Sequence, residues 1–373
     1  MKFFVLGAHP ELSRTEIETV TGAKLVSLAH PEIMLLDGIT TPSTELQERL
    51  AGVIKVGTIV GSLKGFDKQK TADLIRSYIV AYDGKVQFGI STYDKRIAKQ
   101  IQPLGLEVKK RLKADGVSCR LVTSRETALS SVVVQKNHLL EKGGEFIVIP
   151  NGHETLIGKT ETVQNFEAWS NRDFGRPARN AKSGMLPPKL ARIMLNLTGL
   201  EPTKSSVLDP FCGSGTVLME AQLLGFKKIY GSDLSKQAIQ DSKKNLAWLA
   251  RGNGVSLTEL KHGDATTLKL VQLVDAIVTE PYLGRPQKGG ETAQQLETIR
   301  YELLELYEKT FSHLLTLLKP NGMLVVSFPV IGEIPVVPKI KKVRELNTPI
   351  FYKREGQRIG RQIVRWQKVK ADT

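Results

Sequence analysis

Helix-like and strand-like patterns alternate along the N-terminal half of the chain. Apolar residues spaced three or four apart predict helices at residues 71–80, 94–112 and 128–140. Short apolar runs between them predict strands at residues 85–91, 117–122, 145–149 and 155–162. Together with a small element in front of them, these segments predict an α/β domain over residues 1–165.

The alternation returns in the C-terminal half. Apolar runs predict strands that end at residues 208, 231, 261, 278 and 328. The helical spacing predicts helices at residues 236–249 and 296–318. Strands and helices in this order predict a doubly wound parallel sheet. Residues 359–369 alternate apolar and polar positions, which predicts an edge strand whose arginines face solvent or RNA.

The two predicted domains are joined by a segment without a clean period. Residues 166–182 mix aromatic residues, arginines, glycine and proline, so we expect a linker or an ordered loop there. The second domain then covers residues 183–373.

The composition is that of an ordinary globular protein, with 41% hydrophobic and 24% charged residues. No apolar run approaches the ~20 residues needed to cross a bilayer, so we expect no membrane span. Two cysteines, Cys119 and Cys212, can form neither a disulfide framework nor a zinc cluster on their own. We therefore expect a cytoplasmic protein.

The charge is strongly positive. Fifty-three Lys and Arg against 38 Asp and Glu give a net charge of +15, which favours a polyanionic partner. The helix predicted at 94–112 has a basic face that includes Lys95, Lys99, Lys109 and Lys110. The segment between the two predicted domains, residues 166–182 and called the joint below, contains Arg172, Arg176 and Arg179. Phosphate contact is one interpretation of these side chains. A solvated face, or salt bridges in the case of the arginines, is the other.

The string VLDPFCGSGT at residues 207–216 is the most informative stretch of the chain. It combines the end of an apolar strand, a glycine-rich turn and the start of an apolar helix, so backbone N–H groups can approach a cofactor closely. It resembles motif I of S-adenosylmethionine-dependent methyltransferases, in the form typical of enzymes that methylate exocyclic amines. The resemblance implies S-adenosylmethionine as cofactor, with contacts from Asp209, Phe211, Gly213, Gly215 and Thr216.

Further cofactor contacts follow in the chain. Asp233 lies 20 residues after Gly213, where an acidic side chain can accept both ribose hydroxyls of an adenosine cofactor, a spacing that NAD enzymes share. By the resemblance, Asp264 contacts the adenine amine and Ala265 lies beside the ring, whereas Ser183 and Met185 lie near the methionine end. We expect no metal site in this region.

The string Thr279-Glu280-Pro281-Tyr282 follows the strand predicted at 274–278, where amine methyltransferases carry D-P-P-Y or a variant. An exocyclic amine is a poor nucleophile, so acceptors must direct its lone pair at the methyl group while an aromatic residue stacks on the base. This chain has Thr279 where Asp, Asn or Ser is usual, and Glu280 where Pro is usual. Either Thr279 or Glu280 could supply the acceptor, and Tyr282 is the predicted stacking residue.

In domain order the chain resembles the THUMP-containing tRNA guanosine N2-methyltransferases that modify position 10 in archaea and eukaryotes. The THUMP-like region, roughly residues 55–165, implies an RNA partner. The resemblance therefore implies methyl transfer from S-adenosylmethionine to an exocyclic amine of a tRNA base, with guanosine N2 preferred. The alternatives are a DNA adenine or cytosine amine methyltransferase, a non-catalytic RNA-binding protein on the same fold, and a NAD-dependent enzyme. Whether a protein partner is needed stays open.

Overall fold

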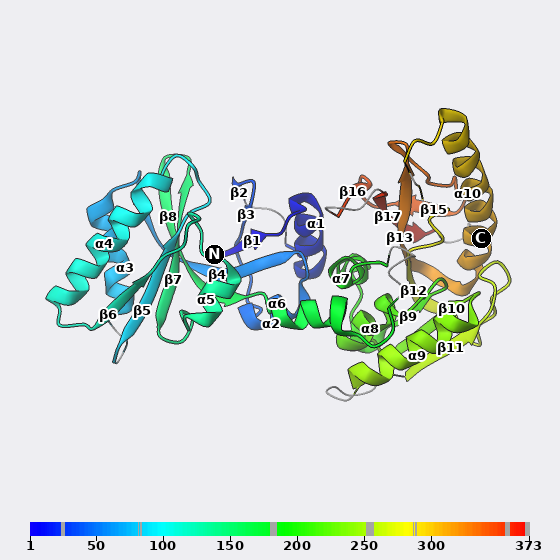
Figure 1. Cartoon of the computed structure of the whole chain (residues 1–373), viewed down its shortest axis with the longest axis horizontal. Coiled ribbons are helices and arrows are strands. Elements are labelled where there is room, and N and C mark those ends of the chain that lie inside the picture. Colours follow the sequence, from blue (N-terminus) through cyan, green and yellow to red (C-terminus); the bar gives the residue numbers. More distant parts are fainter. Residues whose placement is uncertain are drawn as a thin grey trace. The chain divides into compact units, whose positions relative to one another are not determined.

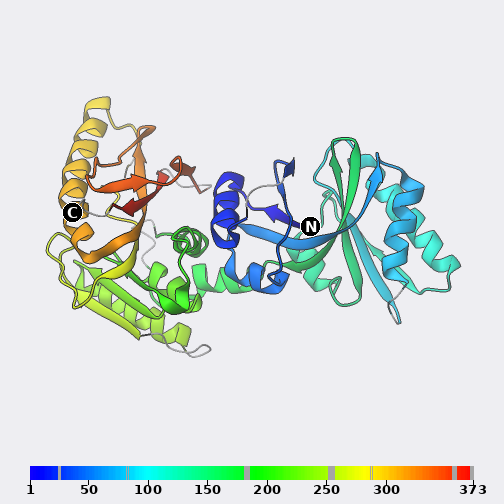
Figure 2. The same cartoon turned by 180° about the vertical axis from the view of Figure 1, so that it is seen from behind.

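The structure, a computed structural model, describes residues 1–23, 27–80, 82, 84–179, 185–250, 257–285, 287, 289–354 and 359–369. The chain divides into two compact units, Met1–Ala168 and Trp169–Thr373 (Figure 1). Each unit consists of a sheet with helices packed on it, as the view from behind also shows (Figure 2). The predicted class, two α/β domains, is confirmed. Among the described residues, no helix has the length and apolar character to cross a membrane.

The first unit contains a mixed eight-stranded sheet in the order β2-β3-β1-β4-β8-β7-β5-β6. Its strands are β1 (Lys2–Leu6), β2 (Ser27–His30), β3 (Ile33–Leu36), β4 (Val53–Lys64), β5 (Val86–Ser91), β6 (Cys119–Val122), β7 (Gly143–Asn151) and β8 (Glu154–Val163). β5 is parallel to β6 and β7, and the remaining pairs are antiparallel.

In the described part of this unit, five helices accompany the sheet: α1 (Pro10–Thr21), α2 (Ser43–Arg49), α3 (Lys68–Ile79), α4 (Ala98–Ala114) and α5 (Ser131–Lys136). α3 and α4 lie side by side on one face of the sheet, with their apolar residues in a common core (Figure 1). The carboxylate of Asp67 accepts the N–H groups of Gln69 and Lys70, which fixes the start of α3. The helix predicted at 128–140 is reduced to the six residues of α5.

The second unit contains a sheet in the order β11-β10-β9-β12-β13-β17-β15, with β14 paired to β13 and β16 to β17. Its strands are β9 (Ser206–Asp209), β10 (Lys228–Asp233), β11 (Leu257–His262), β12 (Val274–Thr279), β13 (Leu318–Ile331), β14 (Ile334–Pro335), β15 (Val343–Glu345), β16 (Ile350–Tyr352) and β17 (Gly360–Lys368). Its helices are α7 (Pro188–Asn196), α8 (Thr216–Leu223), α9 (Lys236–Ala250) and α10 (Ala293–Leu314), with single 3-10 turns at Pro202–Lys204 and Leu315–Leu317.

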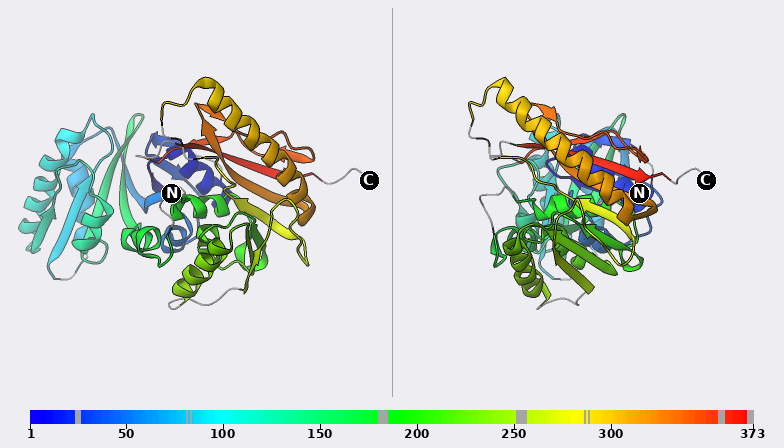
Figure 3. Two further views of the ribbon diagram at one scale, coloured as in Figure 1. Left: turned by 45° about the vertical axis from the view of Figure 1, so that its right-hand side comes forward. Right: turned by 90° about the vertical axis from the view of Figure 1, so that its right-hand side faces the viewer.

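The strand order of this unit creates a switch point between β9 and β12. The chain leaves β9 through α8 toward β10, and leaves β12 through α10 toward β13, in the opposite direction. Right-handed crossovers therefore put the helices on opposite faces, as Figure 3 shows for α9 and α10. In such folds ligands bind beyond the carboxyl ends of the strands at the switch point.

One predicted element is wrong in its position. The strand predicted at 359–369 exists as β17, but it is not an edge strand, because β13 pairs along one side and β15 and β16 along the other. Two short strands from residues 343–352 cover the side that would otherwise be open. As a result the side chain of Arg361 is only 2% exposed instead of facing solvent or RNA.

The joint also differs from the expected loop. Residues Phe166–Ser170 form a short helix, α6, which continues into a π-helical turn at Asn171–Gly175. Within the second unit, the buried Trp169 ring stacks against Arg172, whose guanidinium carbon lies 4.1 Å from the ring centroid. The irregular hydrophobic pattern of the segment did not predict this contact.

Candidate active site

A cavity of ≈ 1120 Å³ opens in the second unit beyond the carboxyl ends of β9, β10, β11 and β12. Its wall includes most of the predicted cofactor and catalytic residues: Met185, Asp209, Phe211, Gly213, Thr216, Asp233, Asp264, Ala265, Glu280, Pro281 and Tyr282. Gly215 and Thr279 are not part of that wall, and Ser183 lies outside the described residues. The parallel register explains the grouping, since Asp209, Asp233 and Thr279 all end strands at the same edge of the sheet.

The glycine turn between β9 and α8 has two left-handed residues, Gly213 at φ 50° and Gly215 at φ 87°. A Cβ at Gly213 would meet no atom within 4 Å, so the space in front of this backbone is open. A Cβ at Gly215 would lie 2.9 Å from the Ser242 hydroxyl, so Gly215 permits close packing of the turn on α9. The first glycine therefore faces the cavity and the second supports the turn.

The carboxylate of Asp233 is tied to this turn. Its two oxygens accept the backbone N–H groups of Gly213, at 2.9 Å, and Ser235, at 2.8 Å. Each carboxylate oxygen can accept a further hydrogen bond, so Asp233 can still bind the hydroxyl groups of a ligand in the cavity. On the neighbouring strand end, the Asp264 carboxylate accepts the Thr266 N–H at 2.8 Å, a bond that lowers the pKa of Asp264.

Carboxylates, a nearby apolar surface at Ala265 and an open glycine turn suit an adenosine-bearing cofactor. The two acidic groups can accept ribose and amine donors, and the glycine turn allows the cofactor to approach the backbone. No three His, Cys, Asp or Glu side chains in the described part of the chain are grouped in a way that could hold a metal ion.

Asp209 and Thr279 face each other from the ends of β9 and β12. The Thr279 hydroxyl, fully buried, donates to Asp209 Oδ1 at 2.6 Å, and the Phe211 N–H donates to the same oxygen at 3.1 Å. Burial raises the pKa of Asp209 to about 7, against the lowering effect of these two donors. Because Thr279 already binds Asp209 and lies outside the cavity wall, the structure does not bring its hydroxyl to a substrate amine.

Glu280, in contrast, lies in the cavity wall and is held from behind. Arg361 of β17 donates from Nε to Glu280 Oε1 at 2.6 Å and from Nη2 to Oε2 at 3.3 Å. The Ser327 hydroxyl of β13 adds a third bond to Oε1, at 2.9 Å. Bidentate arginine–carboxylate pairs fix orientation strongly, so this carboxylate has a defined position. The sequence offered no signal for this contact, because it depends on how β17 pairs with β13.

Tyr282 lies at the rim of the cavity, with 52% of its surface exposed. Its backbone carbonyl accepts the hydroxyl of Tyr307, a buried residue of α10 that sequence reasoning missed. The backbone is thus held while the ring stays accessible, which suits stacking on a planar base.

The arginines of the joint differ in their surroundings. Arg172 binds the fully buried Glu220 at 2.7 Å, which favours the salt-bridge interpretation for this side chain over phosphate contact. Arg176 is only 3% exposed, and its guanidinium binds the Thr216 hydroxyl and the Met185 sulfur, so phosphate contact by Arg176 is not supported either. Arg179 is exposed beside the Phe174 ring, and phosphate contact there stays a prediction.

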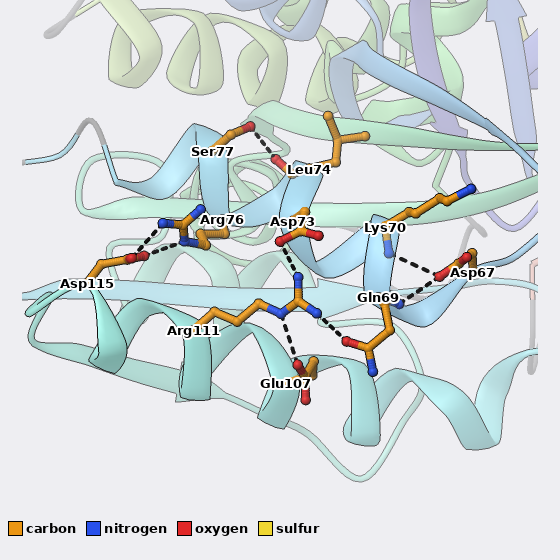
Figure 4. Close-up of polar contacts among 10 residues, drawn as sticks. All are labelled: Asp67, Gln69, Lys70, Asp73, Leu74, Arg76, Ser77, Glu107, Arg111 and Asp115. Atoms are coloured by element: carbon orange, nitrogen blue, oxygen red, sulfur yellow. Dashed lines mark hydrogen bonds and ion pairs between the residues drawn. The ribbon is translucent and has the colours of Figure 1, made fainter.

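Acidic residues of α3 and of α4 itself neutralise part of the positive charge of α4. Arg111 of α4 forms ion pairs with Asp73 of α3 and with Glu107, and Arg76 of α3 pairs with Asp115 (Figure 4). These contacts connect α3 and α4. Because Arg111 already forms two ion pairs, it is not available for phosphate contact. Lys95, Lys99 and Lys110 are exposed and Lys109 is half-buried, and none of the four forms an ion pair with a described residue.

Comparison with known proteins gives consistent matches. Residues 176–330 match the UPF0020 family, described as an RMKL-like methyltransferase domain. A protein of Pyrococcus abyssi named tRNA (guanine(10)-N2)-dimethyltransferase is 26% identical over 336 residues, 87% of each chain. A protein of the same name from Methanothermobacter thermautotrophicus is 38% identical over 114 residues, which are 30% of this chain and 32% of that one. A probable tRNA (guanine(10)-N2)-dimethyltransferase of Methanothermococcus thermolithotrophicus is 33% identical over 144 residues, 37% of this chain and 77% of the relative.

Solved structures share the fold over the whole chain. TrmN from Thermus thermophilus superposes with a TM-score of 0.56 at 16% identity, over 99% of this chain and 100% of that one. A possible methylase from Clostridium difficile 630 gives a TM-score of 0.55 at 14% identity, over 100% and 98% of the two chains. At these identities the likeness concerns the fold alone.

Proposed function

Because the chain belongs to the tRNA (guanine(10)-N2)-dimethyltransferase family, we propose that it methylates the exocyclic N2 amine of a guanosine in tRNA, at position 10. The observation that carries this proposal is one cavity wall that combines Asp233 and Asp264 with the Glu280-Pro281-Tyr282 turn. The cofactor, S-adenosylmethionine, supplies an activated methyl group when it is bound. The chain's own residues have to hold the cofactor, orient the amine and exclude water.

The two acidic residues beside the glycine turn hold the adenosine part. Asp233 accepts the ribose hydroxyls, and Asp264 accepts the adenine amine with Ala265 against the ring. The support is their position in one wall, next to the open backbone of Gly213.

Glu280 is the acceptor that orients the target amine, in preference to Thr279. Its carboxylate is in the cavity wall and is held by Arg361 and Ser327, whereas the Thr279 hydroxyl is bound to Asp209. A fixed, charged acceptor keeps the amine's lone pair directed at the methyl group better than a neutral hydroxyl does. Tyr282 stacks on the base, which has to leave its own stack to enter the cavity.

The first unit, the THUMP-like part of the chain, binds the tRNA. The support is the exposed lysines on and before α4 and the net charge of +15. Recognition of this kind depends on phosphate contacts and on the shape of a folded RNA.

The test is transfer of labelled methyl groups from S-adenosylmethionine to an unmodified tRNA transcript, with nucleoside analysis of the product. We expect N2-methylguanosine first and N2,N2-dimethylguanosine later, and no label on a transcript with adenosine at position 10. The Tyr282→Ala variant should lose the label. A protein that binds cofactor and tRNA but transfers no label would contradict the proposal and favour the non-catalytic RNA-binding alternative.

A further inference from the structure

Arg176 is a buried cation without an anionic partner. It is 3% exposed, and no carboxylate of the described residues forms an ion pair with it. The two acids nearest in the chain and fold are already used, since Glu220 pairs with Arg172 and Arg192, and Asp173 pairs with Arg354 at 3.0 Å. Keeping a charge buried without a counter-charge is unfavourable, so this arrangement calls for an anion that binds beside it.

The hydrogen bonds that Arg176 forms satisfy only some of its N–H donors. Nη1 donates to the Thr216 hydroxyl at 2.7 Å, and Nη2 points at the Met185 sulfur at 3.2 Å. Nε is buried and has no hydrogen-bond partner. A thioether sulfur is a weak acceptor, and a guanidinium is built to receive a carboxylate on two N–H groups at once. The donor set of Arg176 is therefore largely unsatisfied.

The unsatisfied group lies next to the cavity. Both of its partners, Met185 and Thr216, are in the cavity wall. Thr216 is also the first residue of α8, whose N-cap, Gly215, provides no side-chain acceptor for the free N–H groups. The N-terminus of a helix attracts anions, so the arginine and the helix favour the same kind of ligand at the same place.

We propose that Arg176 and the N-terminus of α8 bind the α-carboxylate at the amino-acid end of the cofactor. Asp233 and Asp264, at the ends of β10 and β11, are left for the adenosine end. This inference rests on the proposed function, because only an S-adenosyl cofactor brings an amino-acid carboxylate to an adenosine site. Arg176 then acts as a binding residue for the cofactor, and the carboxylate replaces the sulfur of Met185 as its partner.

The test compares two ligands on the full chain by isothermal titration calorimetry: S-adenosylhomocysteine and its decarboxylated analogue, which lacks only the α-carboxylate. In the Arg176→Gln variant we expect S-adenosylhomocysteine to bind roughly 10- to 100-fold more weakly, as for a lost charged hydrogen bond. The analogue should bind the variant and the wild type within about threefold, because it has no carboxylate to lose. Arg344→Gln, an exposed arginine of β15, is the matched control and should change neither affinity.

Three results would overturn the inference. The variant could bind S-adenosylhomocysteine as tightly as the wild type. It could lose affinity for both ligands equally, which would make Arg176 a residue that only shapes the cavity. It could keep both cofactor affinities and lose affinity for tRNA, which would make an RNA phosphate the anion. In all three cases wild-type binding of S-adenosylhomocysteine persists, whereas a wild type that binds neither ligand would contradict the proposed function itself and the inference with it.

Discussion

Glu280 and Thr279 are adjacent in the chain, but their side chains have different partners, and this difference can be tested. Glu280→Gln keeps an oxygen for Arg361 and removes the charge that is proposed to orient the amine. We expect the single-turnover rate of methyl transfer to fall by about tenfold to hundredfold, with unchanged affinity for S-adenosylhomocysteine. Thr279→Ser keeps the hydroxyl bond to Asp209 and should retain the rate within about threefold. A Glu280→Gln variant that keeps the wild-type rate would contradict the assignment of the acceptor to Glu280.

Asp209 gives a second prediction at the residue scale, through its titration. Burial raises the pKa of this carboxyl from 3.8 to about 7, so between these values the folded state holds a proton that the unfolded state has lost. Its contribution to the free energy of unfolding is complete below pH 4 and is lost as the pH rises through 7. Asp209→Asn cannot titrate, so its melting temperature should fall less between pH 4 and pH 8 than that of the wild type. Parallel pH profiles of the two proteins, in thermal unfolding without ligand, would contradict the assignment.

At the scale of elements, the turn between β9 and α8 has two glycines whose substitution should separate stability from binding. Gly215→Ala puts a Cβ 2.9 Å from the Ser242 hydroxyl in a left-handed conformation, so we expect a loss of about 1–3 kcal/mol in urea unfolding. Gly213→Ala meets open space and should cost about 1 kcal/mol of left-handed strain. Its methyl group projects into the cavity front, however, so it should weaken S-adenosylhomocysteine binding more than Gly215→Ala does. Calorimetry of both variants measures these affinities. Weaker binding by Gly215→Ala than by Gly213→Ala would contradict the conclusion that Gly213 faces the cavity.

The elements also differ in how far the sequence could predict them. β9, the glycine turn and α8 follow from residues within one short string, because strand end, turn and helix start are all local features. The start of α10 is local too, since Thr292 and Gln295 form a reciprocal capping box. The position of β17 is not local. Its alternation predicts a strand, but only the pairing with β13, β15 and β16 makes it an interior one.

The same distinction holds for the candidate site. The residues that the sequence located, such as Asp233 and Tyr282, lie within a few residues of the ends of predicted strands, where the fold class itself puts ligand contacts. The residues that it missed reach the site from elements distant in the chain, as Arg361 does from β17 and Tyr307 from α10. Arg176 was assigned by charge alone, and only its burial in the structure distinguishes it from a surface cation.

At the scale of the whole molecule, the net charge of +15 makes binding of a polyanion sensitive to salt. Each lysine that contacts a phosphate adds about 0.7–0.9 to the slope of log affinity against log salt concentration. The charge alone does not locate the contacts, because exposed lysines occur in both units. Substitutions that remove equal charge from different surfaces can locate them.

Three of the exposed lysines on and before α4 are the set to change in the first unit: Lys95, Lys99 and Lys110. Replacing all three with glutamine should reduce the salt slope of tRNA binding by about 2, and should leave affinity for S-adenosylhomocysteine unchanged. The matched control removes three exposed lysines from α9 in the second unit: Lys236, Lys243 and Lys244. Filter binding of the tRNA transcript across a salt series measures both slopes. Equal reductions in the two variants would mean that net charge, and not the α4 surface, determines tRNA affinity, whereas a reduction confined to the first variant assigns the phosphate contacts to that surface.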